Sequence, residues 1–172
     1  MITNNFEVIV SNAEENLDNC LSVEEQVKML AHVKAKTVFE ETEGERLVIG
    51  SDTIVVKNNK IYGKPKNHDE AMSMLKELEN AKHEVMTGLS IMYEKDGKVN
   101  EILDVSITSV YISEVTDIEL ENWIASNEAY DKAGGYAIQG KFGVFVEKIE
   151  GDYFTVVGLP LHKLYEAIKN LI

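Results

Sequence analysis

The sequence is poor in cysteine and arginine and has no long apolar run, and each shortage excludes a class of protein. A single cysteine, Cys20, cannot form an internal disulfide, which fits a reducing cytosol. One arginine, Arg46, and a formal net charge of −13 argue against broad contact with nucleic acid, because such contact needs clustered basic side chains. No apolar run approaches the roughly 18 residues of a membrane helix, and the polar opening MITNNFE lacks the core of a signal peptide. We therefore expect a cytoplasmic protein with neither nucleic acid nor membrane as a partner.

Length and composition predict one globular domain spanning residues 1–172. The chain has 172 residues, of which 44% are hydrophobic and 27% charged, as in ordinary globular proteins. The four histidines show neither HxH nor HExxH spacing, so a zinc site is not expected.

The stretch 47–65, LVIGSDTIVVKNNKIYGKP, is the most informative part of the sequence. It places Asp52 in the middle of an apolar strand, and burying a carboxylate costs several kcal/mol unless it is paired or hydrogen-bonded. Gly50 lets another backbone or a ligand approach, and Pro65 fixes the direction of Lys64. Two interpretations stay open at this point: a functional acid, or a strand-end aspartate that neighbouring amides satisfy.

The remaining pattern predicts an α/β domain with a mixed, twisted sheet flanked by helices. Capping patterns predict helices over residues 23–41, after Asn67 and after Thr116, and Pro160 is expected in the first turn of a last helix. Turn residues predict a tight turn at 58–59 and a hairpin of strands 84–93 and 99–112. Alternation predicts a first strand over residues 5–11. A final hairpin of residues 143–149 and 153–157 is expected around Glu150-Gly151-Asp152.

Two loops carry residues suited to binding. Glu14 and Glu15 lie in an acidic loop, where a carboxylate pair is usually solvated surface but is also what Mg2+ uses. Residues 130–140, YDKAGGYAIQG, combine three glycines with two tyrosines and fit neither GxGxxG nor the P-loop pattern. This second loop has the composition of one that wraps a ligand.

Three separated groups of motifs together resemble one family. They are residues 50–53 (GSDT) with 63–65 (GKP), residues 83–88 (HEVMTG), and residues 130–140 with 151–153 (GDY) and 157–160 (VGLP). In this order, along nearly the whole chain, they resemble the Maf family of nucleoside triphosphate pyrophosphatases, named for septum formation. The resemblance implies a fold like that of inosine triphosphatase, and hydrolysis of a nucleoside triphosphate to the monophosphate and pyrophosphate with a divalent metal, Mg2+ or Mn2+.

The resemblance also implies catalytic roles for individual residues. Asp52 matches the catalytic aspartate, the general base on the attacking water. Lys34 and Lys64 match lysines that bind phosphate oxygens, and Glu15 matches a metal ligand, with Glu14 as the neighbouring candidate. A buried acid, two fixed ammonium groups and a metal carboxylate are what phosphoanhydride hydrolysis requires, since it depends on positioning and charge neutralisation.

Two further positions bear on which nucleobase the substrate carries. Thr53 and Gln139 match positions associated with the choice of nucleobase. The pairing of Asp-Thr with the Gly-Tyr-Ala-Ile-Gln-Gly loop resembles the dTTP and UTP branch rather than the branch acting on 7-methylguanosine triphosphate.

The sequence departs from the family at its beginning. Family members carry an apolar strand and a Ser-x-Ser-Pro-Arg-Arg segment ahead of the stretch matching residues 5–11, and these arginines bind phosphate. We expect Arg46 not to substitute for them. Two alternatives to an active enzyme follow: a nucleotide-binding or regulatory protein with weak or no catalysis, and a chain that forms homodimers or aggregates through an exposed sheet edge.

Overall fold

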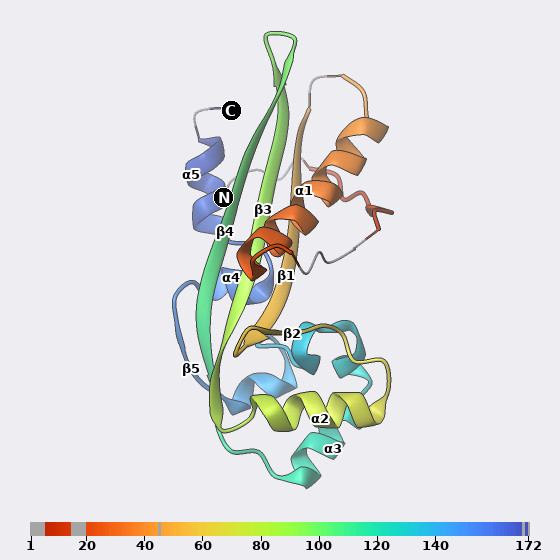
Figure 1. The fold of residues 1–172 in the computed structure, drawn as a ribbon. Helices are drawn as coiled ribbons and strands as arrows, with labels where there is room; N and C mark the ends of the chain where they lie inside the picture. Colours follow the sequence, from red (N-terminus) through yellow and green to blue (C-terminus); the bar gives the residue numbers. More distant parts are fainter. Residues whose placement is uncertain (1–5, 15–19, 45, 170, 172) are drawn as a thin grey trace. The chain divides into compact units, whose positions relative to one another are not determined.

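The computed structural model describes residues 6–14, 20–44, 46–169 and 171, which form a five-stranded sheet and five α-helices (Figure 1). The strands are β1 (Leu47–Lys57), β2 (Lys60–Tyr62), β3 (Ala81–Lys95), β4 (Lys98–Ile112) and β5 (Val146–Glu150), in the order β2-β1-β3-β4-β5. The helices are α1 (Val23–Glu41), α2 (His68–Leu78), α3 (Asp117–Ala125), α4 (Tyr153–Val157) and α5 (Leu161–Ile168). No helix among the described residues is long and apolar enough to cross a membrane. The α/β fold class is confirmed.

Local sequence signals placed most of these elements correctly. Ser22 caps α1 and Thr116 caps α3, each with a complete capping box, and the side chain of Asn67 caps α2. Both predicted two-residue turns have positive φ at both positions, 52° and 61° at residues 58–59 and 54° and 70° at residues 96–97. The α1 prediction has the observed bounds.

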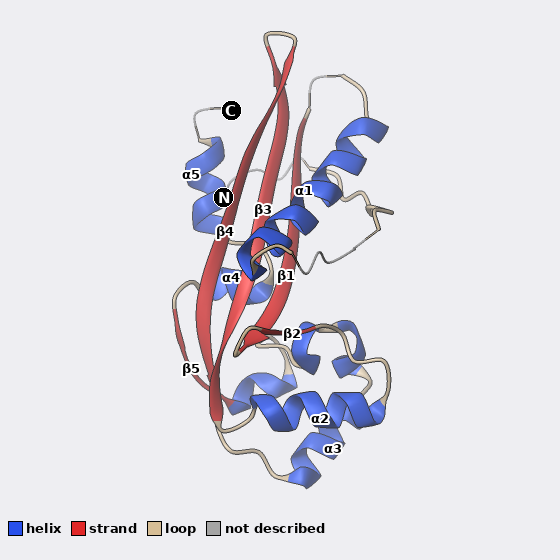
Figure 2. Ribbon diagram, viewed as in Figure 1, coloured by secondary structure: helices blue, strands red, loops and turns tan. Residues whose placement is uncertain are grey.

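Three predictions about strands are corrected. Residues 6–11 form no strand, and Phe6, Val8 and Val10 are largely exposed. The sheet is antiparallel rather than mixed in the described chain, and both pairs with a described register, β1–β2 and β4–β5, are antiparallel (Figure 2). The second arm of the final hairpin is instead helix α4, because the Asp152 side chain accepts hydrogen bonds from the amides of Phe154 and Thr155.

The chain divides into two compact units, residues 1–52, 87–106 and 159–172, and residues 53–86 and 107–158. We call them the first and the second unit. Strands β1, β3 and β4 each contribute residues to both.

In the first unit, α1 and α5 cover opposite faces of the sheet. Leu89 and Ile91 of β3 pack against Leu164 and Ile168 of α5. Met92, whose side chain points to the other face of the strand, packs with Ala35 and Phe39 of α1. This alternation fixes which residues of β3 contact α1.

The second unit encloses the larger apolar core. The core joins buried side chains of β1, β3, β4, α2 and α3 with aromatic residues further along the chain, namely Val55, Leu75, Leu78, Val85, Val110, Leu120, Trp123, Tyr136 and Phe142 among others.

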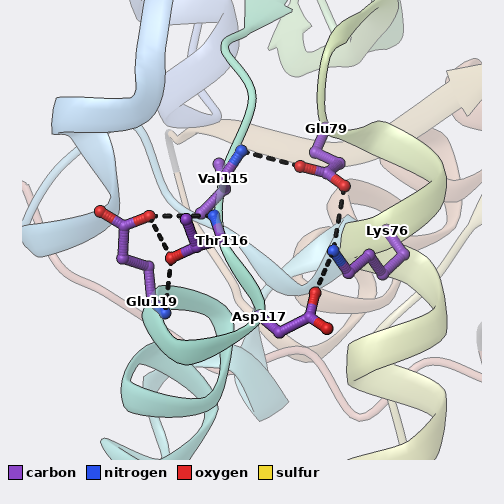
Figure 3. A network of polar contacts seen from close by, with 6 residues as sticks. All are labelled: Lys76, Glu79, Val115, Thr116, Asp117 and Glu119. Carbon is purple, nitrogen blue, oxygen red and sulfur yellow. Dashed lines mark hydrogen bonds and ion pairs between the residues drawn. The ribbon is translucent and has the colours of Figure 1, made fainter.

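A polar network joins α2 to the start of α3 (Figure 3). Glu79, which follows α2, accepts a hydrogen bond of 2.7 Å from the Val115 amide. Its carboxylate also forms an ion pair with Lys76, with 3.2 Å between Nζ and Oε1. Lys76 also pairs with Asp117 in the first turn of α3. These contacts hold the two helices together at the surface of the second unit.

Candidate functional site

Asp52 is paired with Lys34. The Nζ of Lys34, on α1, donates a hydrogen bond to Oδ1 of Asp52, on β1, within the first unit. The side chains are only 25% and 12% exposed, so the pair lies largely out of water. A second charged candidate residue, Lys34, therefore faces this acid.

Two glycines allow α1 to lie close enough to the sheet for this pairing. A Cβ on Gly50 would lie 2.5 Å from the carbonyl oxygen of Ala31 and 2.7 Å from the amide nitrogen of Ala35. A Cβ on Gly88 of β3 would lie 2.3 Å from the carbonyl oxygen of Val27. The predicted close backbone approach at Gly50 is confirmed, and its partner is the helix that carries Lys34. No sequence pattern indicated the partner of Gly88.

Lys64 lies in the second unit, in an exposed turn whose backbone is anchored. The carbonyl oxygen of Gly63 accepts a hydrogen bond of 3.0 Å from the Gly134 amide, and Pro65 is buried. The pKa of the Asp131 carboxyl is lowered, chiefly by its hydrogen bond with Lys132 and to a smaller extent by the charge of Lys64. The turn is therefore joined to the glycine-containing loop.

Thr53 and Gln139 also belong to the second unit. Thr53 directly follows Asp52 on β1 and is half-buried, and its Oγ1 lies 3.4 Å from the position a Cβ on Gly158 would take. Gln139 is exposed. The structure thus pairs Lys34 with Asp52, while Thr53, Lys64 and Gln139 are described within a different unit.

The predicted metal ligand Glu15 lies outside the described residues. Its neighbour Glu14 is exposed. Within residues 6–14, 20–44, 46–169 and 171, no group of three or more His, Cys, Asp or Glu side chains is arranged to hold a metal ion.

Arg46 contacts the end of α1 and the residues that follow it. Its guanidinium donates hydrogen bonds to the carbonyl oxygens of Gly44 at 2.6 Å and Phe39 at 2.9 Å, and lies 4.1 Å from the centroid of the Phe39 ring. These contacts secure the carboxyl end of α1.

Tyr136, in the loop at 130–140, forms a buried pair with His83 that sequence reasoning missed. His83, on β3, and Tyr136 are 2% and 5% exposed, and His83 Nε2 lies 2.6 Å from the Tyr136 hydroxyl. Burial raises the pKa of the Tyr136 hydroxyl. Burial, with a smaller contribution from the charge of Lys57, lowers the pKa of His83 to about 4. Both side chains are therefore neutral near pH 7. The only sequence signal was that each lies in one of the Maf-like motifs.

Protonation of the unfolded chain at His83 is expected to destabilise the protein in acid. An unfolded histidine has a pKa near 6.5, so between about pH 6.5 and 4 the unfolded state binds a proton that the folded state does not. The free energy of unfolding should therefore fall by about 3 kcal/mol across this window as the pH decreases. Urea denaturation of the wild type and of His83→Gln at pH 7 and 4.5 measures this, and an equal pH dependence in both would contradict it.

Comparison with known proteins adds to this geometry. A family model described as Maf-like protein matches residues 1–171. The dTTP/UTP pyrophosphatase of Alkaliphilus oremlandii is 47% identical over 165 residues, covering 96% of this chain and 84% of the relative. That of Lachnoclostridium phytofermentans is 45% identical over 167 residues, with coverages of 96% and 84%. That of Clostridium perfringens strain SM101 is 42% identical over 170 residues, with coverages of 98% and 88%.

Proposed function

Since this chain belongs to the Maf family, we propose that it is a pyrophosphatase that hydrolyses dTTP and UTP to the monophosphate and pyrophosphate. The observation that carries the proposal is the Lys34–Asp52 pair, which places an ammonium group against a largely buried carboxylate. Such a pair supplies a base and a phosphate-binding cation at one place. We also propose that the protein acts in the cytoplasm.

Asp52 is the general base that takes a proton from the attacking water. Lys34 and Lys64 bind phosphate oxygens and stabilise the negative charge that develops in the transition state. Lys34 has a second task before substrate binds, because its ion pair offsets the cost of burying the Asp52 carboxylate.

A divalent cation, Mg2+ or Mn2+, is part of the proposal. Such hard cations take one or two carboxylates together with substrate oxygens, and carboxylates are the donors that Asp52, Glu14 and Glu15 offer. We propose Glu15 as the protein ligand, with Glu14 as its neighbouring candidate. When bound, the cation neutralises phosphate charge.

Thr53 and Gln139 are proposed to determine which nucleobase binds. Gln139 is exposed and its amide can both donate and accept a hydrogen bond, as the edge of a pyrimidine requires. Thr53 directly follows Asp52, the proposed general base, in the sequence of β1.

Pyrophosphate release from dTTP, UTP and CTP, each with Mg2+ and with Mn2+, tests the proposed function. Release from dTTP and UTP that depends on the cation and exceeds release from CTP supports it. Calorimetric binding of UTP without release would reject hydrolysis and favour a nucleotide-binding protein.

Replacing Lys64 with methionine is expected to lower kcat/KM for UTP about 10- to 100-fold, because a charge-assisted phosphate contact is lost. Steady-state kinetics measure this. Lys66→Met is the matched control, since Lys66 is also exposed and also adjoins Pro65. Equal losses in the two variants would mean that general charge, not a specific contact, accounts for the effect.

A further inference from the structure

The buried pair of His83 and Tyr136 joins strand β3 to the loop that carries Gln139. The two rings meet edge to face, 5.3 Å between centroids and 81° between planes. Their single hydrogen bond, 2.6 Å long, links residues 53 positions apart in the sequence. No partner of His83 Nδ1 is described, so this bond is the polar contact that orients the imidazole among the described residues.

The loop is held at three consecutive residues by three different segments. The Gly134 amide donates to the carbonyl oxygen of Gly63 at 3.0 Å. The carbonyl oxygen of Gly135 accepts a 2.7 Å hydrogen bond from the buried indole of Trp123. Tyr136 then bonds to His83. Of these three, only the last acts through a side chain of the loop itself, and it is nearest in sequence to Gln139.

The residue before Gln139 is restrained from the other direction. A Cβ on Gly143 would lie 2.4 Å from the carbonyl oxygen of Ile138, so these two backbones are in close contact. Tyr136, which also packs against Phe142 with 5.4 Å between ring centroids, fixes the preceding side. The short segment 136–138 is therefore restrained at both ends, by the contacts of Tyr136 and by the close approach of Gly143 to Ile138. Gln139 directly follows this segment and is exposed.

We propose that His83 is a positioning residue for nucleotide selection, acting through the Tyr136 hydroxyl to fix the segment that presents Gln139. This inference rests on the proposed function and on the role proposed there for Gln139. A hydrogen bond between two neutral, buried groups suits the task, because it constrains the loop without placing a charge near the base.

Selectivity between nucleotides is the readout that a merely structural role would not change. Tyr136→Phe removes only the hydroxyl and keeps the ring packing, while His83→Leu removes the imidazole. Both are expected to lower the ratio of kcat/KM for UTP to that for CTP about 3- to 10-fold. His83→Gln should retain the ratio, because its terminal amide lies near the position of Nε2 and can still bond to the hydroxyl.

Ile112→Val is the control for stability. Ile112 is 3% exposed in the same apolar core, and the change removes one methyl group without touching a polar contact. It should lower the melting temperature and leave the UTP to CTP ratio unchanged.

The outcomes separate the inference from the function on which it rests. A lower ratio in Tyr136→Phe and His83→Leu, with the ratio retained in His83→Gln and Ile112→Val, supports the inference. An active wild type whose ratio is unchanged in Tyr136→Phe, or equally lowered in Ile112→Val, overturns the inference alone. A wild type that releases no pyrophosphate rejects the proposed function and the inference with it.

Discussion

Replacing Asp52 with asparagine is expected to lower kcat for UTP hydrolysis about 100- to 10,000-fold, because an amide cannot accept the proton of the attacking water. Asparagine keeps the size of the side chain, so the close packing of α1 on the sheet should persist. Pyrophosphate release under saturating substrate measures the effect. Asp104→Asn is the matched control, because Asp104 is also paired with a lysine, Lys163 at 2.7 Å, in the same unit. Near wild-type turnover in Asp52→Asn would reject its role as base.

The ion pair with Lys34 offers a competing explanation that a double-mutant cycle can test. Asp52 could affect catalysis only by orienting Lys34, whose Nζ it binds. In that case Asp52→Asn would cost nothing further in a Lys34→Met background. If Asp52 is the base, the second change should still lower kcat by about 100-fold.

Elements defined by local chemistry could be read from the sequence. The capping boxes at Ser22 and Thr116 satisfy amides within three residues, and the Asn58-Asn59 and Asp96-Gly97 turns need only residues that tolerate positive φ. No distant contact is needed for either signal. These elements were therefore predictable from short windows.

Predictions of strands from short apolar segments were less successful. Residues 153–157, YFTVV, are β-branched or aromatic, and so short an apolar run does not distinguish strand from helix. Asp152 favours the helix here, because its side chain accepts hydrogen bonds from the first amides of α4. Residues 6–11 do alternate in part, yet the apolar side chains at 6, 8 and 10 are largely exposed, so a strand there would bury little apolar surface.

The candidate site shows a similar division. The need for a partner at Asp52 follows from the cost of burying a carboxylate, and the need for a close neighbour follows from Gly50 in a strand. The identity of the partner does not follow from either signal, because Lys34 and Asp52 meet only through the packing of α1 on β1. His83 and Tyr136 illustrate the same limit, since nothing near either residue in sequence indicates the other.

Replacing Gly88 with alanine is expected to lower the free energy of unfolding by about 3 kcal/mol, because the added methyl group would overlap the backbone of α1. Its Cβ would lie 2.3 Å from the carbonyl oxygen and 2.8 Å from the carbonyl carbon of Val27, and backbone atoms cannot rotate away as a side chain can. The helix must move outward as a whole. Urea denaturation monitored by circular dichroism measures the loss.

This change should also affect the enzyme while it remains folded. Moving α1 outward carries Lys34 away from Asp52, so kcat should fall under conditions where denaturation shows the variant to be native. Gly50→Ala should act in the same way, since its Cβ would lie 2.5 Å from the Ala31 carbonyl oxygen on the same helix. Gly63→Ala is the control for stability alone, because a Cβ there meets nothing within 4 Å. Comparable stability in Gly88→Ala and Gly63→Ala would show that close contact with α1 does not determine how the helix packs.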